Sequence, residues 1–243
     1  MYEFTVENFR SFGSAQTLSL MKGKEQKKPE NLTAGPSGFP KAVRVAAIFG
    51  HNASGKSNLF LAAQTVWQTI MFSATGLNSG NLIPGIIPHR LDPSWDDKPT
   101  RFEIVFPVRD RVFRYGFSAL PKMITAETLV EELSSGKQRT LFDRKIRTTG
   151  DASQVEFSEE FDRAAKDNVP KLTRDNALIL SSGANLNVPL LRDIHARIGT
   201  GAVPVSFSPI GPTPGLLAKN IQEDTSFRSQ LMAALRDADI GIT

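Results

Sequence analysis

The residues from Gly50 to Ser57 have the types and the spacing of a phosphate-binding loop. A glycine is followed by four residues and then by Gly55, Lys56 and Ser57, which matches the G-x-x-x-x-G-K-[ST] pattern. Glycines allow the close backbone approach that turns N–H groups towards an anion. Lys56 would reach the β- and γ-phosphates, and the Ser57 hydroxyl is expected to bind Mg²⁺. The pattern predicts that the chain binds a nucleoside triphosphate, but binding alone is not hydrolysis.

The segments on either side of this loop support the prediction. Residues 43–49 form a short, branched, apolar run that is typical of a buried strand, and residues 58–64 begin a helical pattern. A chance glycine-rich turn before a helix is the alternative, but strand, loop and helix in this order is the context that the motif requires. The residues expected to contact the nucleotide are Gly50, Asn52, Ala53, Ser54, Gly55, Lys56, Ser57 and Asn58.

The composition is that of an ordinary globular protein, since 40% of the residues are hydrophobic and 22% are charged. The 243 residues can form one domain, or one domain with a smaller annex. The absence of cysteine excludes disulfides and zinc–thiolate sites and agrees with a predicted cytoplasmic location. Residues 1–7 lack the order of a signal peptide, and no apolar run approaches the ~18 residues of a membrane-spanning helix.

The net charge of +4 leaves nucleic-acid binding open. Lysines and arginines gather in residues 22–28 and again in residues 137–147. Such runs can bind DNA or another anionic partner, or they can form a solvated loop and an exposed strand face. The paired acids Glu131–Glu132 and Glu159–Glu160 are interpreted as solvated faces. DNA contact is therefore a hypothesis at this stage.

The elements that must position the loop are a strand pair before it and a β-rich region after its helix. Alternating apolar residues predict strands at 2–9 and 14–20, joined by a tight turn. Residues 22–40 and 76–99 have the composition of loops. From residue 101 to residue 142, alternation and turn signals predict an antiparallel meander.

Residues 158–243 are predicted to be largely helical. The last helix is expected to begin near Asp224 or Thr225 and to end at Gly241. Its apolar positions at helical spacing are Phe227, Leu231 and Leu235. A hairpin before the loop and a meander after the first helix differ from the alternating strands and helices of a GTPase, and they indicate an α/β fold with an antiparallel β-subdomain.

Two stretches carry a family resemblance, residues 7–12 (Glu-Asn-Phe-Arg-Ser-Phe) and residues 47–59. They resemble the N-terminus of ABC-type ATPases of the RecF/SMC class. They are closer still to bacterial AAA family ATPases of the OLD and abortive-infection type. Residues 113–117, 124–129 and 235–242 are also similar to that group. Only the loop motif is specific by itself.

The resemblance implies a P-loop NTPase core that binds ATP and Mg²⁺ and dimerises around the nucleotide. The implied partners are a second copy or a second ATPase subunit, a nuclease effector and DNA, without a membrane, in phage defence or DNA repair. It places Arg10 near the bound nucleotide, where a cation would stabilise phosphate charge. The alternative for Arg10 is a surface arginine in a turn.

The sequence departs from this family where catalysis is concerned. The family's Walker B strand is an apolar run that ends in Asp-Glu, whereas residues 104–110 are interrupted by Pro107 and residues 203–207 contain no acid. Residues 180–184 resemble the Leu-Ser-x-Gly signature, but no Walker B follows within ~30 residues. We interpret them as the end of a buried segment, 177–180, followed by a Ser-Gly turn. The catalytic residues are thus unknown.

The resemblance suggests that the chain is the N-terminal part of a longer ATPase: a truncated form, a truncated gene or one subunit of two. Residues 1–157 would form the nucleotide-binding lobe with its β-subdomain. Residues 158–243 would form a helical region that stops before the signature and Walker B. Hydrolysis by this chain alone is then expected to be weak or absent, while binding survives.

Two other functions stay open. A P-loop phosphotransferase that acts on a small molecule would have an arginine-rich lid and alternating strands and helices, whereas residues 101–157 are predicted to be β-rich. A non-catalytic interaction module would retain the nucleotide for structure only.

Overall fold

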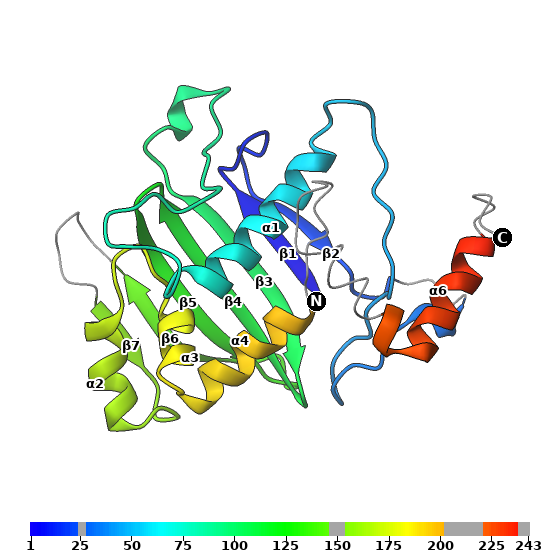
Figure 1. Cartoon of the computed structure of the whole chain (residues 1–243). Coiled ribbons are helices and arrows are strands. Elements are labelled where there is room, and N and C mark those ends of the chain that lie inside the picture. Colours follow the sequence, from blue (N-terminus) through cyan, green and yellow to red (C-terminus); the bar gives the residue numbers. More distant parts are fainter. Residues whose placement is uncertain (24–27, 146–153, 202–220, 238–243) are drawn as a thin grey trace. The chain divides into compact units, whose positions relative to one another are not determined.

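The computed structural model describes residues 1–23, 28–145, 154–201 and 221–237 (Figure 1). The chain forms two compact units, Met1–Val203 and Pro204–Thr243. The domain boundary predicted between residues 157 and 158 stays a prediction. Among the described residues, no helix is long and apolar enough to cross a membrane.

The first unit is built on one antiparallel sheet. Its strands are β1 (Glu3–Glu7), β2 (Gln16–Ser19), β3 (Thr100–Val108), β4 (Arg111–Leu120), β5 (Met123–Glu132), β6 (Gln138–Lys145) and β7 (Gln154–Phe157). Their order is β2-β1-β3-β4-β5-β6-β7, and every neighbouring pair is antiparallel. From β3 onwards, each strand pairs with the next one along the chain.

The helices of the first unit cover one face of this sheet (Figure 1). They are α1 (Lys56–Phe72), α2 (Arg163–Leu172), α3 (Ile179–Asn185) and α4 (Pro189–Gly201). Two short 3-10 helices, η1 (Pro29–Asn31) and η2 (Pro93–Trp95), lie in the loops. The described part of the second unit contains α6 (Thr225–Asp237).

Alternation along the strands decides which face the helices cover. In β1, Phe4 and Val6 are buried in the main core while Glu3 and Glu7 are partly exposed. Since successive strand residues point to opposite faces, this pattern turns one apolar face towards the helices. On the other face, a smaller cluster is formed by Tyr2, Phe39, Ala42, Val105 and Val112.

Most of the elements expected from the sequence are present. The two-stranded start, the antiparallel meander and the helix after the glycine loop are confirmed. The last helix begins at Thr225, and the Asp224 carboxylate accepts a hydrogen bond from the N–H of Phe227 at 2.9 Å. Phe227 and Leu231 are only partly buried, and Gly241 lies outside the described residues. The strand β7 was not predicted.

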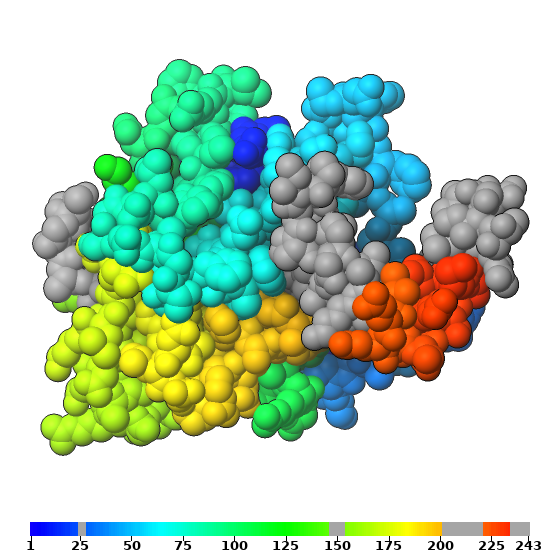
Figure 2. Space-filling view, in the orientation of Figure 1, coloured from blue at the N-terminus to red at the C-terminus, as the bar shows by residue number. Residues whose placement is uncertain are grey.

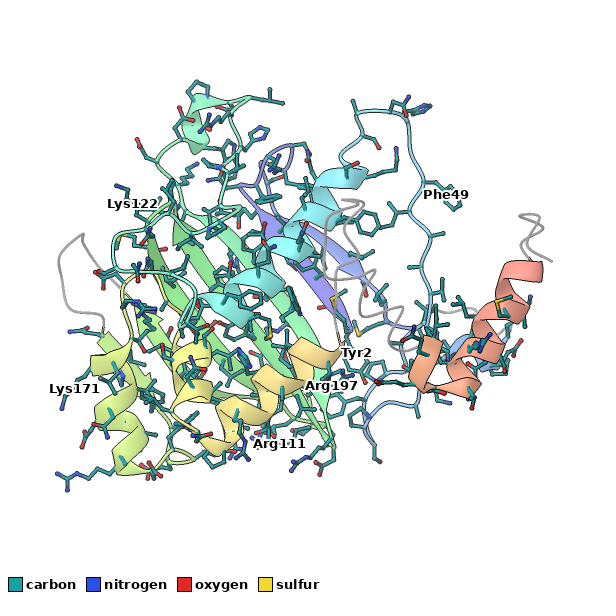
Figure 3. All side chains as sticks on the ribbon, in the orientation of Figure 1. Tyr2, Phe49, Arg111, Lys122, Lys171 and Arg197 are labelled. Carbon is teal, nitrogen blue, oxygen red and sulfur yellow. The ribbon has the colours of Figure 1, made fainter. Side chains whose placement is uncertain are left out.

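The strand predicted for residues 43–49 is wrong. Val43 makes one isolated bridge, to Leu32, and the residues that follow are irregular. Val45 is 83% exposed and Phe49 is 90% exposed, and Figure 3 shows the Phe49 side chain pointing away from α1. An apolar run forms a strand only beside a neighbouring strand, and the described residues offer none to this segment.

A buried carboxylate connects the sheet to the helices. Glu127 in β5 and Arg144 in β6 are both 0% exposed, and their charged groups lie 3.6 Å apart. Glu127 also accepts hydrogen bonds from the N–H groups of Ile179 and Leu180, the first residues of α3, at 2.6 and 2.9 Å. The Tyr115 hydroxyl donates to it at 2.9 Å. Because buried charges are stable only when paired and hydrogen-bonded, these contacts fix α3 against the sheet.

Burial changes the titration of this group. It raises the pKa of Glu127, and Arg144, the two N–H groups and Tyr115 oppose that rise. Burial and then the Glu127 charge raise the pKa of Tyr115 well above its ordinary value, so the hydroxyl keeps its proton and donates.

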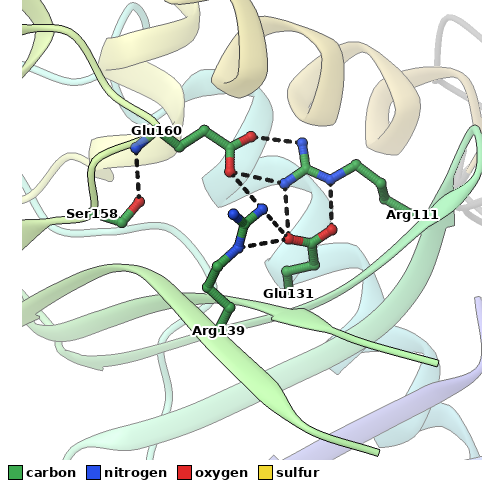
Figure 4. Close-up of polar contacts among 5 residues, drawn as sticks. All are labelled: Arg111, Glu131, Arg139, Ser158 and Glu160. Atoms are coloured by element: carbon green, nitrogen blue, oxygen red, sulfur yellow. Dashed lines mark hydrogen bonds and ion pairs between the residues drawn. The ribbon is translucent and has the colours of Figure 1, made fainter. Parts of the chain in front are cut away.

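A second group of charges joins three strands to the turn before α2 (Figure 4). Arg111 donates to both carboxylate oxygens of Glu131 and of Glu160, and Arg139 donates to the same two glutamates. Burial would raise the pKa of Glu131, but the hydrogen bonds from the two arginines outweigh it and lower that pKa. The Glu131 contribution to stability is therefore present above its ordinary pKa and is lost as the pH falls through its lowered value.

These contacts correct the interpretation of the charged runs. Arg144 is buried in the core and Arg139 is paired, so neither belongs to a free cationic surface. Glu131 is buried, so it is not part of a solvated face. Arg147 and residues 24–27 lie outside the described ranges. The structure therefore removes Arg144 from the surface that could bind DNA, and it pairs Arg139, which is 51% exposed, with Glu131 and Glu160.

Replacing Glu127 by alanine should lower the free energy of unfolding by about 3–5 kcal/mol, because Arg144 would be left buried without its charged partner. Urea denaturation followed by circular dichroism measures this. The control is Glu159→Ala at an exposed glutamate, which should stay within about 0.5 kcal/mol of the parent protein. Equal effects of the two substitutions would contradict the role given to Glu127.

Candidate functional site

The glycine loop leads directly into α1, which begins at Lys56. Gly55 precedes the helix with φ 90°, in the left-handed region that favours glycine, and Ala53 also has a positive φ of 65°. The first N–H groups of a helix have no acceptor within it, and they carry the positive end of the helix dipole. The turn thus presents free backbone donors at the start of a 17-residue helix, which is an arrangement that attracts phosphate.

Close contacts explain why glycine stands at position 50. A Cβ built there would lie 2.7 Å from Oγ of Ser54, so any other residue would require the Ser54 side chain to move. The residues between the two glycines, from His51 to Ser54, are exposed. They are therefore accessible to a ligand.

Lys56 turns back over the loop. Its Nζ donates to the carbonyl oxygens of Gly50 and His51 at 2.7 and 2.6 Å and lies 3.4 Å from Oγ of Ser54. The ammonium group is thus held over the loop by neutral oxygens. Phosphate oxygens carry more negative charge than carbonyl oxygens, so they would compete for the same donor.

The turn between β1 and β2 packs against the other side of the loop. A Cβ at Gly55 would lie 3.0 Å from Oγ of Ser11 and 3.7 Å from the ring of Phe12. The side-chain amide of Asn58, in the first turn of α1, donates to the Ser11 hydroxyl at 2.8 Å. Asn58, predicted to contact the nucleotide, is thus also a structural link to this turn.

Arg10 lies in the same turn, with a left-handed φ of 50°. Its N–H donates to the carbonyl of Ile87, and its guanidinium carbon lies 5.7 Å from the centroid of the Phe9 ring. Its Nε is buried and has no hydrogen-bond partner among the described residues. A buried donor without a partner costs free energy, which makes Arg10 a suitable group for an anionic ligand.

Asn8 holds the loop at residues 87–98 against this turn, a role that was not predicted from the sequence. Its side chain is fully buried and donates to the carbonyls of Trp95 and Lys98 at 3.1 and 2.6 Å. It accepts from the N–H of His89 at 2.8 Å. The only signal was the motif at residues 7–12, which contains Asn8 but does not reveal its partners.

The opposite end of α1 is held by hydrogen bonds from α3, α4 and the loop between α2 and α3. Arg174 donates to the carbonyls of Ser73 and Ala74 at 3.3 and 2.7 Å, and the Ser181 hydroxyl donates to the carbonyl of Ile70 at 2.6 Å. The ring of His195 lies 3.2 Å from the same Ile70 carbonyl, and burial lowers its pKa. These donors satisfy carbonyls that a helix end leaves without partners.

The stretch that resembles a signature lies inside α3. Residues 179–184 are buried, so the interpretation as a buried segment is confirmed, but the predicted Ser-Gly turn is wrong because these residues are helical. As α3 lies in the core, this stretch does not present a surface to a second subunit.

The metal prediction at Ser57 stays a prediction. Its hydroxyl is in the first turn of α1 and is exposed. Across the described ranges, no group of three or more histidine, aspartate or glutamate residues could hold a metal ion. A hydroxyl beside bound phosphates suits Mg²⁺, which is held by one or two protein ligands, substrate phosphates and water.

The fold and the loop define a mixed α/β protein with a glycine-rich turn at the start of its first helix. The chain belongs to the family described as "AAA domain, putative AbiEii toxin, Type IV TA system", whose sequence model matches residues 45–232. Comparison with curated proteins finds no match. Membership of an AAA domain family implies a nucleotide-binding, ATPase-like function, which typically uses Mg²⁺.

Replacing Gly55 by alanine should destabilise the protein by more than the equivalent change at Gly80. Both glycines have a positive φ, 90° and 79°, but a Cβ at Gly80 meets nothing within 4 Å. Each substitution should cost about 1–2 kcal/mol for the left-handed backbone, and Gly55→Ala should add the contact with Ser11. Urea denaturation measures both free energies of unfolding. Equal costs, or a difference that persists in a Ser11→Gly background, would contradict the close packing at Gly55.

Proposed function

We propose that the chain binds ATP as an ABC/SMC-like ATPase with a P-loop NTPase fold. The observation that carries the proposal is the exposed loop at residues 50–55, which ends in α1 at Lys56 and packs at Gly55 against the turn that contains Arg10 and Ser11. Family membership supports it. The antiparallel order from β3 to β7 disfavours a phosphotransferase, in which strands and helices would alternate.

In this proposal the loop binds ATP in three ways. The N–H groups of the loop and of the first turn of α1 surround the phosphates at the positive end of the helix. Lys56 exchanges its carbonyl contacts for phosphate oxygens, and Ser57 holds Mg²⁺. Arg10 adds a cation beside the loop. The residues that would hold Mg²⁺ apart from Ser57, and those that would activate water, stay unassigned, so hydrolysis by this chain alone is expected to be weak or absent.

We further propose that ATP acts as a switch for association with a second copy or a second ATPase subunit. Exposed apolar side chains near the loop in the sequence support this: Val45 and Phe49 are 83% and 90% exposed, and Phe60, in the first half of α1, is 60% exposed. Association with a partner would remove such side chains from water. The family's description as a toxin–antitoxin type favours phage defence over DNA repair. A nuclease effector, DNA and a cytoplasmic location belong to the same proposal.

Replacing Lys56 by alanine should weaken MgATP binding by at least about tenfold, because the charged hydrogen bonds to the phosphates are lost. Isothermal titration calorimetry with the whole chain measures the affinity. Lys171→Ala, at an exposed lysine near the end of α2, is the matched control and should bind like the parent protein. Unchanged ATP affinity in the Lys56 variant would refute the proposed site.

Addition of MgATP should raise the molar mass of the protein measured by light scattering, and Phe49→Ser should reduce that rise without reducing ATP affinity. The reason is that Phe49 is exposed beside the loop and makes no hydrogen bond to it. A molar mass that ATP leaves unchanged, at saturating nucleotide, would favour the non-catalytic module over the switch.

A further inference from the structure

We propose that the cavity between α1, α4, β1 and β3 binds a small aliphatic carboxylate, with the alkyl chain inside the cavity and the carboxylate beside Arg197. The cavity is lined by none of the residues assigned to the nucleotide. The inference therefore goes beyond the proposed function and does not depend on it.

The cavity lies where α1 and α4 meet on the helix-covered face of the sheet. Figure 2 shows the two helices side by side at the surface. They approach closely near the end of each helix, because a Cβ at Gly199 would lie 3.0 Å from Sδ of Met71. Two turns earlier on α1, the small side chain of Ala63 lines the cavity.

The walls of the cavity are apolar and buried. Phe4 lines it from β1, Ile104 and Phe106 from β3, and Val66 and Ile198 from the two helices. Its volume is about 80 Å³, roughly half of the ~150 Å³ in which a benzene ring fits, so it suits an alkyl chain of about three or four carbon atoms. Such a chain gains free energy when it leaves water for an apolar cavity.

Arg197 gives the cavity a charged end. Among the described residues that line the cavity, Arg197 alone is charged, and it is exposed (Figure 3). Its guanidinium makes no ion pair with any residue that the structure describes. The carboxylate one turn earlier on α4, that of Asp193, is bound by Arg109 at 2.9 Å and by Arg192 at 3.3 Å. Arg197 is therefore free to bind an anion from solution.

Trp67 adds a second hydrogen-bond donor to the lining. Its ring is held edge-on against Phe72, with the two centroids 5.6 Å apart. Its Nε1 is buried and has no hydrogen-bond partner among the described residues. Because an indole N–H can only donate and a buried donor without a partner costs free energy, an acceptor bound in the cavity would be stabilised where it reaches this group.

These groups select the charge and the type of the ligand. A guanidinium and an indole N–H only donate, so they match an anion and reject an amine. The guanidinium fork binds the two oxygens of a carboxylate in one plane. A phosphate monoester carries about two negative charges at pH 7, of which a single arginine would balance one. The lining thus fits an aliphatic monocarboxylate.

The first test titrates the whole chain with acetate, propanoate, butanoate and pentanoate and follows the emission of Trp67. The protein contains two tryptophans, so a Trp95→Phe background leaves Trp67 as the source of the signal. Each added methylene up to butanoate should raise the affinity about fourfold, because it is buried in the cavity. Butylamine, which carries the opposite charge, should not bind, and butyl phosphate should bind more weakly than butanoate.

Substitutions at the two ends of the cavity test the assignment of the residues. Arg197→Gln should weaken butanoate binding by at least about fivefold, since the charged hydrogen bonds are lost. Arg192→Gln, at an exposed arginine of the same helix that does not line the cavity, is the matched control and should bind like the parent protein. Ala63→Leu should weaken binding by at least about tenfold, because the larger side chain fills the space of the ligand. Circular dichroism checks the folding of each variant, and the arginine pair decides if Ala63→Leu does not fold.

The glycine loop also attracts anions, so the Lys56→Ala variant separates the two sites. It should keep the butanoate affinity of the parent protein. Loss of butanoate binding in this variant would place the carboxylate at the glycine loop and refute the inference. Absence of butanoate binding to the parent protein, equal affinities for acetate and butanoate, equal effects of Arg197→Gln and Arg192→Gln, or tighter binding of butyl phosphate would each overturn it as well. None of these results bears on ATP binding, which the Lys56 titration with MgATP tests.

Discussion

The buried carboxylate of Glu127 is the interaction on which the arrangement of the first unit depends. It lies in the sheet, pairs with Arg144 and binds the first N–H groups of α3. From α3, the hydroxyl of Ser181 reaches the C-terminal end of α1. Arg144 in turn donates to the carbonyl of Ala177, just before α3. Through α3, these buried charges help to hold the C-terminal end of α1, the end opposite the loop, while Ala62, Val66 and Ile70 pack the helix in the core.

The sequence predicted local elements well because their signals are local. Alternating apolar residues predict β1 to β6, and residues 58–64 predict the first helix, which begins two residues earlier, at Lys56. Asp224 has the residue type of a helix cap and acts as one. In each case, the residues that form the sequence pattern also make the interaction that stabilises the element: the apolar strand residues are themselves buried, and Asp224 itself caps the last helix.

The failures concern partners that are distant in the chain. Residues 43–49 have the apolar composition of a buried strand, but pairing decides whether such a run becomes one. Arg144 belongs to a basic run and is nevertheless buried, because Glu127 faces it from the neighbouring strand. Asn8 binds residues almost ninety positions away. Composition shows none of these partners. The sequence therefore predicted the residues of the phosphate loop but not the contacts that surround the loop.

The packing of Ser11 on Gly55 has a consequence for the accuracy of strand pairing. A slip of one residue between β1 and β3 would exchange the buried faces of Phe4 and Val6 with those of their polar neighbours. It would also move Ser11 by more than 3 Å relative to Gly55, with which Ser11 is in close contact. Burial of Phe4 and Val6 therefore fixes the register of β1 against β3. Through that register it also fixes the position of Ser11 beside Gly55, and so the packing of the glycine loop.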